Sequence, residues 1–413
     1  MKVLIIHYKH GAVVGTIRMG GLIKYLPYFG WEPIVLTNKP SPELNKFKVV
    51  TVPYDDSYYI KKLPGLLKNV NENSNLVIKI IRYLWDAFFL YPDIQKYWYY
   101  PAMQAADDLL KNQDVDVIVS SFPPVTPHSI AKSLKEKHGI PWVADMRDLW
   151  TQYSYYSYSN FFPRKLLEKR LEIKTLTKAN CLIIVSKPLA KILRKLHKAH
   201  EDIFIIPNGF DPENVNPGIP LTEKFSITYA GGLWNGKRDP GILFDAIKQL
   251  NLENKINITD FEINFFGPDE DLLREMVEKH DIVDIVNIHG PIPRDEVIKR
   301  EWRSQMLLLL MWDNPHEEGV FTGKIFEYLA SKRPIISIGY KGGVVDELLA
   351  KTSAGTSLND IDEIKEEIFR AYSEFKSSGK VSYNGISEEI DKYSHKEMAK
   401  RFSDVFNIII KKN

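Results

Sequence analysis

Short apolar segments alternate with helix-forming segments along the whole chain, and this alternation constrains the fold more than any other feature. The strand-like segments of the first half are KVLIIHY (2–8), EPIVLT (32–37), DVIVSS (116–121), PWVADM (141–146) and CLIIVS (181–186). The second half restarts the pattern with FSITYAG (225–231), FEINFFG (261–267), VNIHG (286–290), QMLLLLMW (305–312) and PIISIG (334–339). Such alternation is typical of βαβ units, which build parallel sheets with right-handed crossovers. We therefore expect an α/β protein with doubly wound sheets.

The chain of 413 residues exceeds what one hydrophobic core usually serves, so we expect two domains. A Pro-, Gly- and Asn-rich stretch at 207–222 predicts a hinge. We assign 1–210 to a first domain and 211–393 to a second, and 394–413 reads as a helix with Ser394 as its N-cap. Two such domains facing across a cleft would bind ligand at the carboxyl ends of their strands.

Charge is distributed unevenly along the chain. Residues 1–210 carry a net charge of +11 and residues 211–413 a net charge of −9, although the total is only +2. This asymmetry suggests different partners for the two domains, or merely solvated lysine-rich helix faces. The single cysteine, Cys181, lies in an apolar strand-like run and can form no intrachain disulfide, which fits a reducing, cytoplasmic setting.

The segment GVFTGKIFEYLASKRPI (319–335) predicts a ligand site. It joins a turn, a helix and a short apolar strand. A helix N-terminus offers unpaired N–H groups and a positive dipole end, which suit phosphate, and Lys324 adds a positive charge. Glu327 follows about one turn later, so both side chains can face one site. A phosphate cradle beside a carboxylate suited to a ribose diol indicates nucleotide binding, with an ordinary β-loop-α-β unit as the alternative.

Two further glycine turns of the second half point to anion binding. The segment YAGGLWNGKRDP (229–240) places Lys237 and Arg238 just after the glycine pair Gly231-Gly232. Adjacent cations beside such a turn would neutralise a diphosphate. The pair Gly342-Gly343 precedes a helix expected near residue 344 and is another candidate for an anion-facing helix N-terminus.

The first half offers a glycine-rich loop of its own. Residues 7–21 contain Gly11, Gly15, Gly20 and Gly21, but neither the GxGxxG nor the GxxxxGK[ST] spacing, so neither an NAD site nor a kinase-type phosphate site is supported. Glycines here still allow a ligand to approach the backbone. We expect Arg18 in the first turn of the following helix, facing the cleft.

Charged residues also end a strand-like segment at ADMRDLW (144–150). Asp145, Arg147 and Asp148 are unusual at the end of a buried strand, where charges need partners or a function. A catalytic or acceptor-orienting carboxylate is the functional interpretation, and a buried Asp–Arg pair is the structural one, which we prefer for Asp145. His128 and His7 are weaker candidates, because a lone histidine is more often structural.

Aromatic and basic residues mix in two stretches of the first half. Residues 54–100 hold twelve aromatic residues among lysines and arginines, and TQYSYYSYSNFFPRK (151–165) is similar. This mixture suits a membrane interface or a sugar-binding surface, or aromatics that pack under long helical insertions. No nucleic-acid-binding module is evident, so we expect no nucleic-acid partner.

Taken together, the chain resembles the retaining glycosyltransferases of the GT-B fold, in the large glycosyl transferase group 1. The resemblance covers essentially the whole length. It rests on the first glycine-rich loop, PPVTPHSIAKSLKEKHGIPWVADMRDLW (123–150), IPNGFD (206–211), the KRDP loop and FTGKIFEYLASKRPI (321–335). PDIQKYWYYPAM (92–103) is similar to a stretch of polysaccharide-type members. The resemblance implies two Rossmann-like domains, with a C-terminal helix that crosses back to the first.

The resemblance also implies roles for individual residues. Glu327 would hold the ribose hydroxyls of a nucleotide sugar, Lys237 or Arg238 would contact its diphosphate, and Gly15 would let phosphate and sugar approach. Asp148 would orient the acceptor.

Three positions depart from the family pattern. The first family glutamate falls on Gly319, one residue after Glu318, the candidate in its place. The family arginine after the strand-end glycine falls on Gly232, so Arg238 and Lys324 would supply that charge. A common His-Asp pair reads Arg147-Asp148 here.

The implied activity is metal-independent transfer of a sugar from a nucleotide diphosphate sugar to a hydroxyl of a glycan, lipid-linked or polysaccharide precursor, with retention. We expect no cofactor beyond the donor substrate and no metal ion. The alternatives are a sugar-nucleotide 2-epimerase of the same fold and a non-catalytic sugar-nucleotide-binding subunit. The basic, aromatic-rich first domain suggests peripheral contact with the inner face of the membrane.

Overall fold

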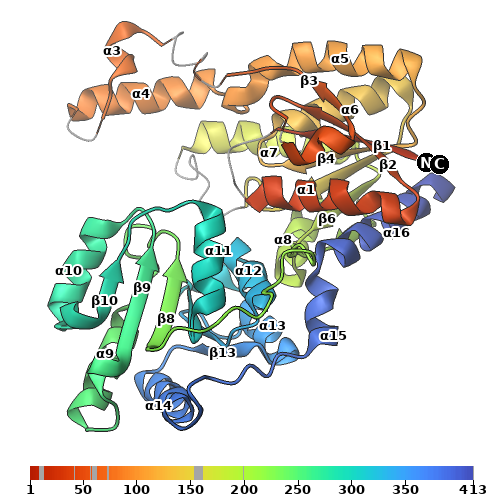
Figure 1. The fold of residues 1–413 in the computed structure, drawn as a ribbon. Helices are drawn as coiled ribbons and strands as arrows, with labels where there is room; N and C mark the ends of the chain where they lie inside the picture. Colours follow the sequence, from red (N-terminus) through yellow and green to blue (C-terminus); the bar gives the residue numbers. More distant parts are fainter. Residues whose placement is uncertain are drawn as a thin grey trace. The chain divides into compact units, whose positions relative to one another are not determined.

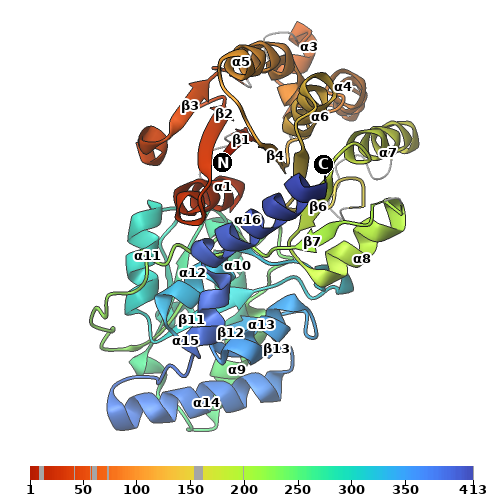
Figure 2. The ribbon, with the colours of Figure 1, turned by 90° about the vertical axis from the view of Figure 1, so that its right-hand side faces the viewer.

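The computed structural model describes residues 1–8, 14–40, 42–55, 57, 63–71, 74–152, 161–198 and 200–412. It forms two compact units, one of Met1–Pro207 together with Met398–Asn413 and the other of Asn208–Glu397. Figures 1 and 2 show each unit as a sheet covered by helices. None of the described helices combines the length and the apolar character that crossing a membrane requires.

In its described part, the first unit contains a seven-stranded parallel sheet in the order β3-β2-β1-β4-β5-β6-β7. Its strands are β1 (Lys2–His7), β2 (Glu32–Thr37), β3 (Lys48–Thr51), β4 (Val117–Phe122), β5 (Trp142–Met146), β6 (Cys181–Ile184) and β7 (Ile203–Ile205). Its helices are α1 (Val14–Tyr25), α3 (Gly65–Lys68), α4 (Leu76–Phe89), α5 (Tyr99–Asn112), α6 (Thr126–His138), α7 (Phe162–Leu176), α8 (Lys187–Leu196) and α16 (His395–Lys412), with 3₁₀ turns at Leu26–Phe29, Pro42–Lys46 and Ile94–Trp98.

The second unit contains a six-stranded parallel sheet in the order β10-β9-β8-β11-β12-β13. Its strands are β8 (Phe225–Ala230), β9 (Phe261–Phe266), β10 (Val286–Ile288), β11 (Met306–Leu310), β12 (Ile335–Ile338) and β13 (Gly355–Leu358). Its helices are α9 (Gly241–Leu252), α10 (Glu270–His280), α11 (Arg294–Arg303), α12 (Gly323–Ser331), α13 (Val344–Thr352), α14 (Ile361–Ser378) and α15 (Ser387–Ile390), with 3₁₀ turns at Ile258–Asp260, Val283–Ile285, Pro315–Glu317 and Asp391–Tyr393.

Both sheets are covered on both faces, because successive side chains of their central strands point in opposite directions. In β1, Leu4 packs among residues of α5, α6 and α8, whereas Ile5 packs among residues of α1 and α16. In β11, Leu308 packs against α9 and α14, whereas Leu309 packs against α12 and α13. The expectation of two doubly wound α/β domains is thus confirmed, as is the buried strand expected at the LLLL run.

All ten strand-like segments form strands, but the sequence pattern missed β3, β7 and β13. These three short strands lie at sheet edges. An edge strand has a neighbour on one side only and need not be apolar along its length, as the segments KVVT of β3 and GTSL of β13 illustrate.

The C-terminal helix α16 packs in the first unit. Phe402 and Phe406 belong to the same hydrophobic cluster as Val3 of β1, and Phe406 packs edge-on against Trp31. Ser394 Oγ accepts a hydrogen bond from the Glu397 backbone N–H at 3.2 Å, as expected of an N-cap. Cys181 is buried in β6, as expected, and burial raises the pKa of its thiol.

Candidate active site

Strand β8 ends in a turn that lies directly against the side chain of Lys324. Gly231 has a φ of +137°, and a Cβ added to it would collide with Nζ and Cε of Lys324. Only glycine adopts this backbone conformation readily, and only glycine leaves the lysine room. A Cβ added to Gly232 would stand 3.0 Å from Asp269 Oδ2. The glycine pair therefore allows the end of β8, helix α12 and the start of α10 to approach one another.

Tyr229, the last residue but one of β8, connects two predicted cations. Lys324 Nζ donates a hydrogen bond to the Tyr229 hydroxyl at 2.9 Å, and the positive charge of Arg238 lies close enough to lower the pKa of this tyrosine. The hydroxyl itself donates to the Gly232 carbonyl at 2.8 Å. Burial raises the pKa of Tyr229 to about 12, although Arg238 opposes the shift. The protonated phenol thus holds Lys324 at the carboxyl end of β8, with the charge of Arg238 nearby.

Lys324 has an unusual proton affinity for a lysine. Burial and, to a smaller extent, the nearby charge of Arg238 lower the pKa of its ammonium group to about 7, against the opposing effects of Glu301 and Glu327. A lysine with this pKa changes charge near neutral pH, where an ordinary lysine is fully protonated.

The helix that carries Lys324 begins without a side-chain cap. Thr322 is the N-cap residue of α12, but its side chain does not cap the helix. The Thr322 hydroxyl is buried and has no hydrogen-bond partner among the described residues. The first amides of α12 thus lack the usual acceptor, which suits an anion at this helix N-terminus.

Glu327 lies on α12 one turn after Lys324 and pairs with Arg294 at the start of α11. The Arg294 guanidinium donates to Glu327 Oε1 at 2.7 Å. Burial raises the pKa of Glu327, whereas Arg294 and Lys324 lower it. Glu301 lies fully buried nearby, and burial together with the charge of Glu327 raises its pKa well above the usual range. The structure thus brings Lys324 and Glu327 together, as their spacing indicated.

The predicted cationic loop folds as a tight turn of left-handed residues. Trp234 and Asn235 both have a φ of 54°, and Gly236 follows with a φ of 78°. Positive φ is common for asparagine and glycine but unusual for tryptophan, and such strain concentrates at functional sites. Arg238 lies over the Trp234 ring at 4.8 Å, and Lys237 lies over the Trp312 ring at 4.5 Å. The two aromatic rings therefore hold the cations in place.

The second glycine pair meets Glu318 through the backbone. A Cβ on Gly343 would stand 3.0 Å from the Glu318 carbonyl oxygen, which accepts a hydrogen bond from the Val344 N–H at 2.8 Å. The Gly342 N–H donates to Asp346 Oδ2 at 3.0 Å. The amides of Gly342 and Val344 are thus already bonded within the unit, and the Glu318 side chain is exposed.

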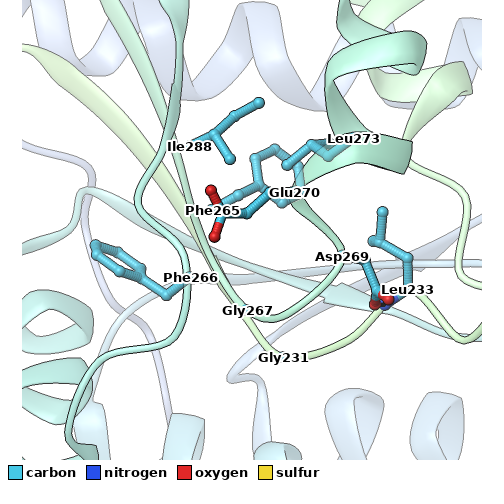
Figure 3. Close-up of a pocket in the computed structure, with 9 residues that line it drawn as sticks. All are labelled: Gly231, Leu233, Phe265, Phe266, Gly267, Asp269, Glu270, Leu273 and Ile288. Carbon is cyan, nitrogen blue, oxygen red and sulfur yellow. Dashed lines mark hydrogen bonds between the residues drawn. The ribbon is translucent and has the colours of Figure 1, made fainter.

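A small pocket adjoins these residues at the ends of β8 and β9 (Figure 3). Gly231 and Leu233 line it from one side, Phe265 and Gly267 from β9 and the turn after it, and Leu273 from α10. Asp269 lies at one end of the pocket beside Leu233, and its carboxylate accepts a hydrogen bond from the Leu233 backbone N–H. The pocket lies on the same strand end as Tyr229.

In the first unit, Arg147 is fixed and Asp148 lies beside it. Arg147 donates through Nε to the Phe122 carbonyl at 2.9 Å and through Nη2 to the Pro123 carbonyl at 2.5 Å. The Asp148 carboxylate makes no hydrogen bond with the described part of the chain. Burial raises its pKa, and Arg147 opposes the shift. Gly15 lies in the first turn of α1, and Gly11 lies outside the described residues.

Arg18 does not have the expected position. It lies in the second turn of α1, is almost completely buried, and pairs with Asp145 at 2.8 Å. Its Nη1 also donates to the Pro207 carbonyl. The expectation of an arginine facing the cleft was wrong, because the buried Asp145 needs a countercharge. The buried Asp–Arg pair preferred for Asp145 is confirmed, and its partner is Arg18.

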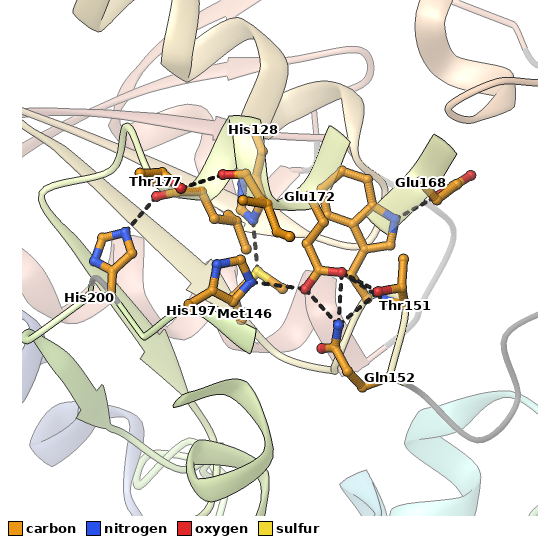
Figure 4. A network of polar contacts seen from close by, with 12 residues as sticks. His128, Met146, Thr151, Gln152, Glu168, Glu172, Thr177, His197 and His200 are labelled. Atoms are coloured by element: carbon orange, nitrogen blue, oxygen red, sulfur yellow. Dashed lines mark hydrogen bonds and ion pairs between the residues drawn. The ribbon is translucent and has the colours of Figure 1, made fainter. Parts of the chain in front are cut away.

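Buried polar networks of the first unit account for His128 (Figure 4). His128 Nδ1 is 2.7 Å from Ser120 Oγ, and Nε2 is 3.2 Å from Met146 Sδ. Burial lowers the pKa of His128 to about 3, so the imidazole stays neutral. Glu172 lies nearby and accepts from Gln152, and its Oε1 is 3.1 Å from His197 Nε2. These histidines fill structural positions, and His7 is likewise buried in β1.

Solved structures resemble the whole chain. A glycosyltransferase from Rickettsia africae ESF-5 matches with a TM-score of 0.64 at 15% identity, covering 100% of this chain and 99% of that one. Sucrose-phosphate synthase from Thermosynechococcus elongatus matches with a TM-score of 0.64 at 13% identity, covering 100% of both. HepE from Anabaena, in complex with UDP and glucose, matches with a TM-score of 0.62 at 12% identity, covering 99% of this chain and 100% of that one. These likenesses show a shared two-domain fold.

The sequence of the first unit matches a protein-family model. Residues 18–214 match the model of Glycosyltransferase Family 4. No curated protein matches the sequence. The chain thus has the GT-B fold, and its first unit matches a glycosyltransferase family.

Three residues of the candidate site were not indicated by the sequence pattern. Tyr229 joins Lys324 to Arg238, Arg294 pairs with Glu327, and Asp269 accepts the Leu233 N–H. Tyr229 at a strand end and Arg294 in the first turn of a helix carry no motif. Their partners lie 95 and 33 residues away in the chain, respectively. In the described ranges of the chain, no group of three or more His, Cys, Asp or Glu side chains is arranged to hold a metal ion.

Proposed function

We propose that this glycosyltransferase moves a sugar from a nucleotide diphosphate sugar to a hydroxyl acceptor with retention at the anomeric carbon. The observation that carries the proposal is the cluster of Lys324 and Arg238 on Tyr229, one helical turn from Glu327. Structures of HepE from Anabaena, a protein of the same fold, contain UDP with glucose and UDP-glucose. The two cations suit a diphosphate, and the carboxylate suits the ribose hydroxyls.

In this proposal the second unit mainly stabilises the negative charge that develops on the leaving diphosphate. When the sugar–phosphate bond breaks, the leaving diphosphate gains negative charge and the sugar becomes oxocarbenium-like. Arg238, Lys237 and Lys324 stabilise the growing charge, together with the uncapped amides of α12. Groups already held in place by Tyr229 and Trp312 need little reorganisation as the charge develops. In this scheme the cations take the role that a metal ion has in other transferases.

The diol of the ribose would be bound by Glu327. Its carboxylate can accept hydrogen bonds from both hydroxyls, and Arg294 holds the carboxylate in position. Because burial raises the pKa of Glu327, its pairing with Arg294 helps keep it ionised for this role. Gly232, Gly342 and Gly343 would let the donor approach the backbone, and Glu318 would contact the donor sugar in place of the glutamate absent at Gly319.

The acceptor would bind at the first unit. Gly15 would admit the donor phosphate and sugar, and Asp148 would orient the attacking hydroxyl. The departing phosphate oxygen accepts the acceptor proton in this front-face scheme, so no separate base is needed. The acceptor is a glycan, a lipid-linked sugar or a polysaccharide precursor. In this proposal the protein works in polysaccharide biosynthesis, in the cytoplasm, with peripheral contact at the inner face of the membrane.

Nucleotide release from a panel of UDP-, GDP- and dTDP-sugars tests this proposal. Slow hydrolysis of one donor, accelerated by acceptor, is the expected result. Interconversion of the sugar without release would instead identify a 2-epimerase, and tight binding without turnover in the presence of acceptors would identify a non-catalytic subunit. We expect Glu327→Ala and Arg238→Ala to weaken donor binding at least tenfold, and unchanged binding in both would refute the site.

A further inference from the structure

Helix α4 of the first unit has an exposed side made only of hydrophobic residues. All of its exposed residues are apolar or aromatic, namely Leu76, Val77, Ile80, Ile81, Tyr83, Leu84, Phe88 and Phe89. Leu76 is 71% and Phe88 58% exposed. The charged residues of α4 are partly buried instead, and Arg82 pairs with Asp86 at 2.9 Å. This inverts the usual surface helix, whose polar face is outside.

The exposed side of α4 is held in place by its neighbours. On its inner side, Ile78 and Trp85 pack against Leu63 and Leu67 of the α3 region. At its C-terminal end, buried Arg164 of α7 donates to the Ala87 carbonyl at 2.5 Å and to the Pro92 carbonyl at 2.8 Å. Helix α4 is therefore a fixed part of the first unit, and its orientation relative to α7 is set (Figure 1).

Aromatic residues continue the apolar surface from α4 onto α7. Phe161 packs edge-on against Tyr83 at 6.1 Å and against Phe88 at 5.8 Å. Phe162, the next residue, is 73% exposed. We call α4 together with the outer side of α7 the α4–α7 surface.

The charged residues on the outer side of α7 are all positive. Its exposed charged residues are Lys165, Lys169, Arg170 and Lys174. Its two acidic residues, Glu168 and Glu172, are buried, and they are bonded to Trp150 and to Thr151, respectively (Figure 4). A helix that buries its carboxylates and exposes its cations presents a basic strip beside an apolar face.

The same two glutamates link the α4–α7 surface to the acceptor side of the first unit. Trp150 Nε1 donates to Glu168 Oε2 at 2.5 Å, and the Thr151 N–H donates to Glu172 Oε2 at 3.2 Å. These residues directly follow Asp148 after β5. Helix α7 therefore carries the docking surface on its exposed side and contacts the segment proposed to orient the acceptor on its buried side.

We propose that the α4–α7 surface docks on an anionic lipid bilayer, with the apolar side of α4 and Phe162 inserted below the headgroups and the α7 cations on the lipid phosphates. This places the peripheral membrane contact of the proposed function, on which it rests, at defined residues. Charge decides between occupants. A second copy of the chain would bring four α7 cations against four others, whereas an anionic bilayer complements them.

Co-sedimentation of the full chain with vesicles tests the docking. We expect binding to vesicles of phosphatidylglycerol and phosphatidylcholine, and much weaker binding to phosphatidylcholine alone. Leu84→Glu/Phe88→Glu should lower binding at least tenfold, whereas Leu252→Glu/Val283→Glu, a matched pair of exposed apolar residues in the second unit, should leave it unchanged. Because all four residues are exposed, the variants should fold, which circular dichroism checks.

A second pair of variants tests the electrostatic part. Lys165→Gln/Lys169→Gln/Arg170→Gln should weaken binding about fivefold per charge removed, since each cation near an anionic surface contributes about that factor. Lys279→Gln/Lys351→Gln/Lys380→Gln, exposed in the second unit, is the control. Absence of vesicle binding by the wild type would overturn the proposal. So would a dimer in ultracentrifugation that Leu84→Glu/Phe88→Glu dissociates. Donor hydrolysis measured without vesicles stays unchanged in all these variants, so a failed docking and a failed transferase assignment are distinguishable.

Discussion

At the scale of single residues, the chemistry of the site depends on how burial changes ordinary side chains. Lys324 is a common residue type, but burial beside Arg238 brings its pKa to about 7. Tyr229 is a common strand residue, but its hydroxyl accepts a hydrogen bond from Lys324 and lies close to the charge of Arg238. Arg18 and Asp145 show the structural counterpart, a buried pair whose charges satisfy each other. Residue type alone does not distinguish a charged side chain of the site from one in a structural pair, because the distinction depends on the neighbouring residues.

The pKa of Lys324 predicts how donor affinity depends on pH. The free protein loses this proton as the pH rises through about 7, whereas a bound diphosphate favours the charged form. Above pH 7 binding must therefore take up a proton, and affinity falls. We expect the Kd of a nucleotide sugar, whose phosphates do not titrate in this range, to rise roughly tenfold between pH 7 and 8.5. Calorimetry in buffers of different ionisation enthalpy measures both Kd and proton uptake.

Lys324→Arg serves as the control for this pH dependence. A guanidinium stays charged throughout this range, so its affinity should be flat with pH. An equal slope in Lys324→Arg and the wild type would assign the titration to another group.

Gly231 allows a second prediction at this scale. Gly231→Ala places a methyl group on Lys324 and strains a φ of +137°, so the lysine must leave Tyr229. We expect at least a tenfold loss of donor affinity. Gly218→Ala, also in the second unit with a φ of +88° but nothing within 4 Å of an added Cβ, imposes backbone strain alone. Equal affinities of the two variants in a nucleotide-binding titration would contradict the role of this contact.

At the scale of elements, hydrophobic pattern was sufficient for the central strands and insufficient at the edges. The LLLL run of β11 is buried on both faces, so its continuous apolar character is required by its place. Strands β7 and β13, at sheet edges, are too short or too polar to be recognised. In helix α4, by contrast, apolar residues do not mark a buried face, because most of them are exposed.

The cap of α16 predicts a stability effect. Ser394→Ala removes the side-chain acceptor for the Glu397 N–H at the start of the helix. N-cap losses typically cost about 1 kcal/mol, and we expect a decrease of that size in the free energy of unfolding. Urea denaturation followed by Trp fluorescence measures it. Ser394→Asp, which keeps an acceptor, should recover most of the loss. If Ser394→Ala were as stable as the wild type, Ser394 would not act as a cap.

At the scale of the whole molecule, the chain divides its charge and its proposed tasks between two units. The basic half corresponds to the unit that carries the α4–α7 surface, and the acidic half to the unit with the cationic cluster. The second unit is acidic overall, yet it gathers Arg238 and Lys324 at one strand end. The net charge of a unit therefore does not locate the anion site, because it is a sum over the whole unit and hides a local cluster of cations.

This division predicts where a nucleotide acts. Saturation with UDP at about one hundred times its Kd should stabilise the binding unit by about 2.7 kcal/mol. Hydrogen–deuterium exchange should show its strongest protection in α12 and the turn after β8, both in the second unit. The same experiment on Arg238→Ala should show little protection. Protection greatest in β4 and β5 would place the nucleotide in the first unit and contradict the assignment.

Local pattern was enough to predict the α/β class, the ten apolar strands, the cap at Ser394 and the segments that carry Lys324, Glu327 and the KRDP loop. These features depend on neighbours a few residues apart. The contact of Lys324 with Tyr229, the pairing of Arg294 with Glu327 and the neutralisation of Asp145 by Arg18 are visible only in the folded chain. Each of these pairs joins residues 33 to 127 positions apart. Burial and long-range pairing arise only when the sheets assemble, and those two effects set the charges of the site.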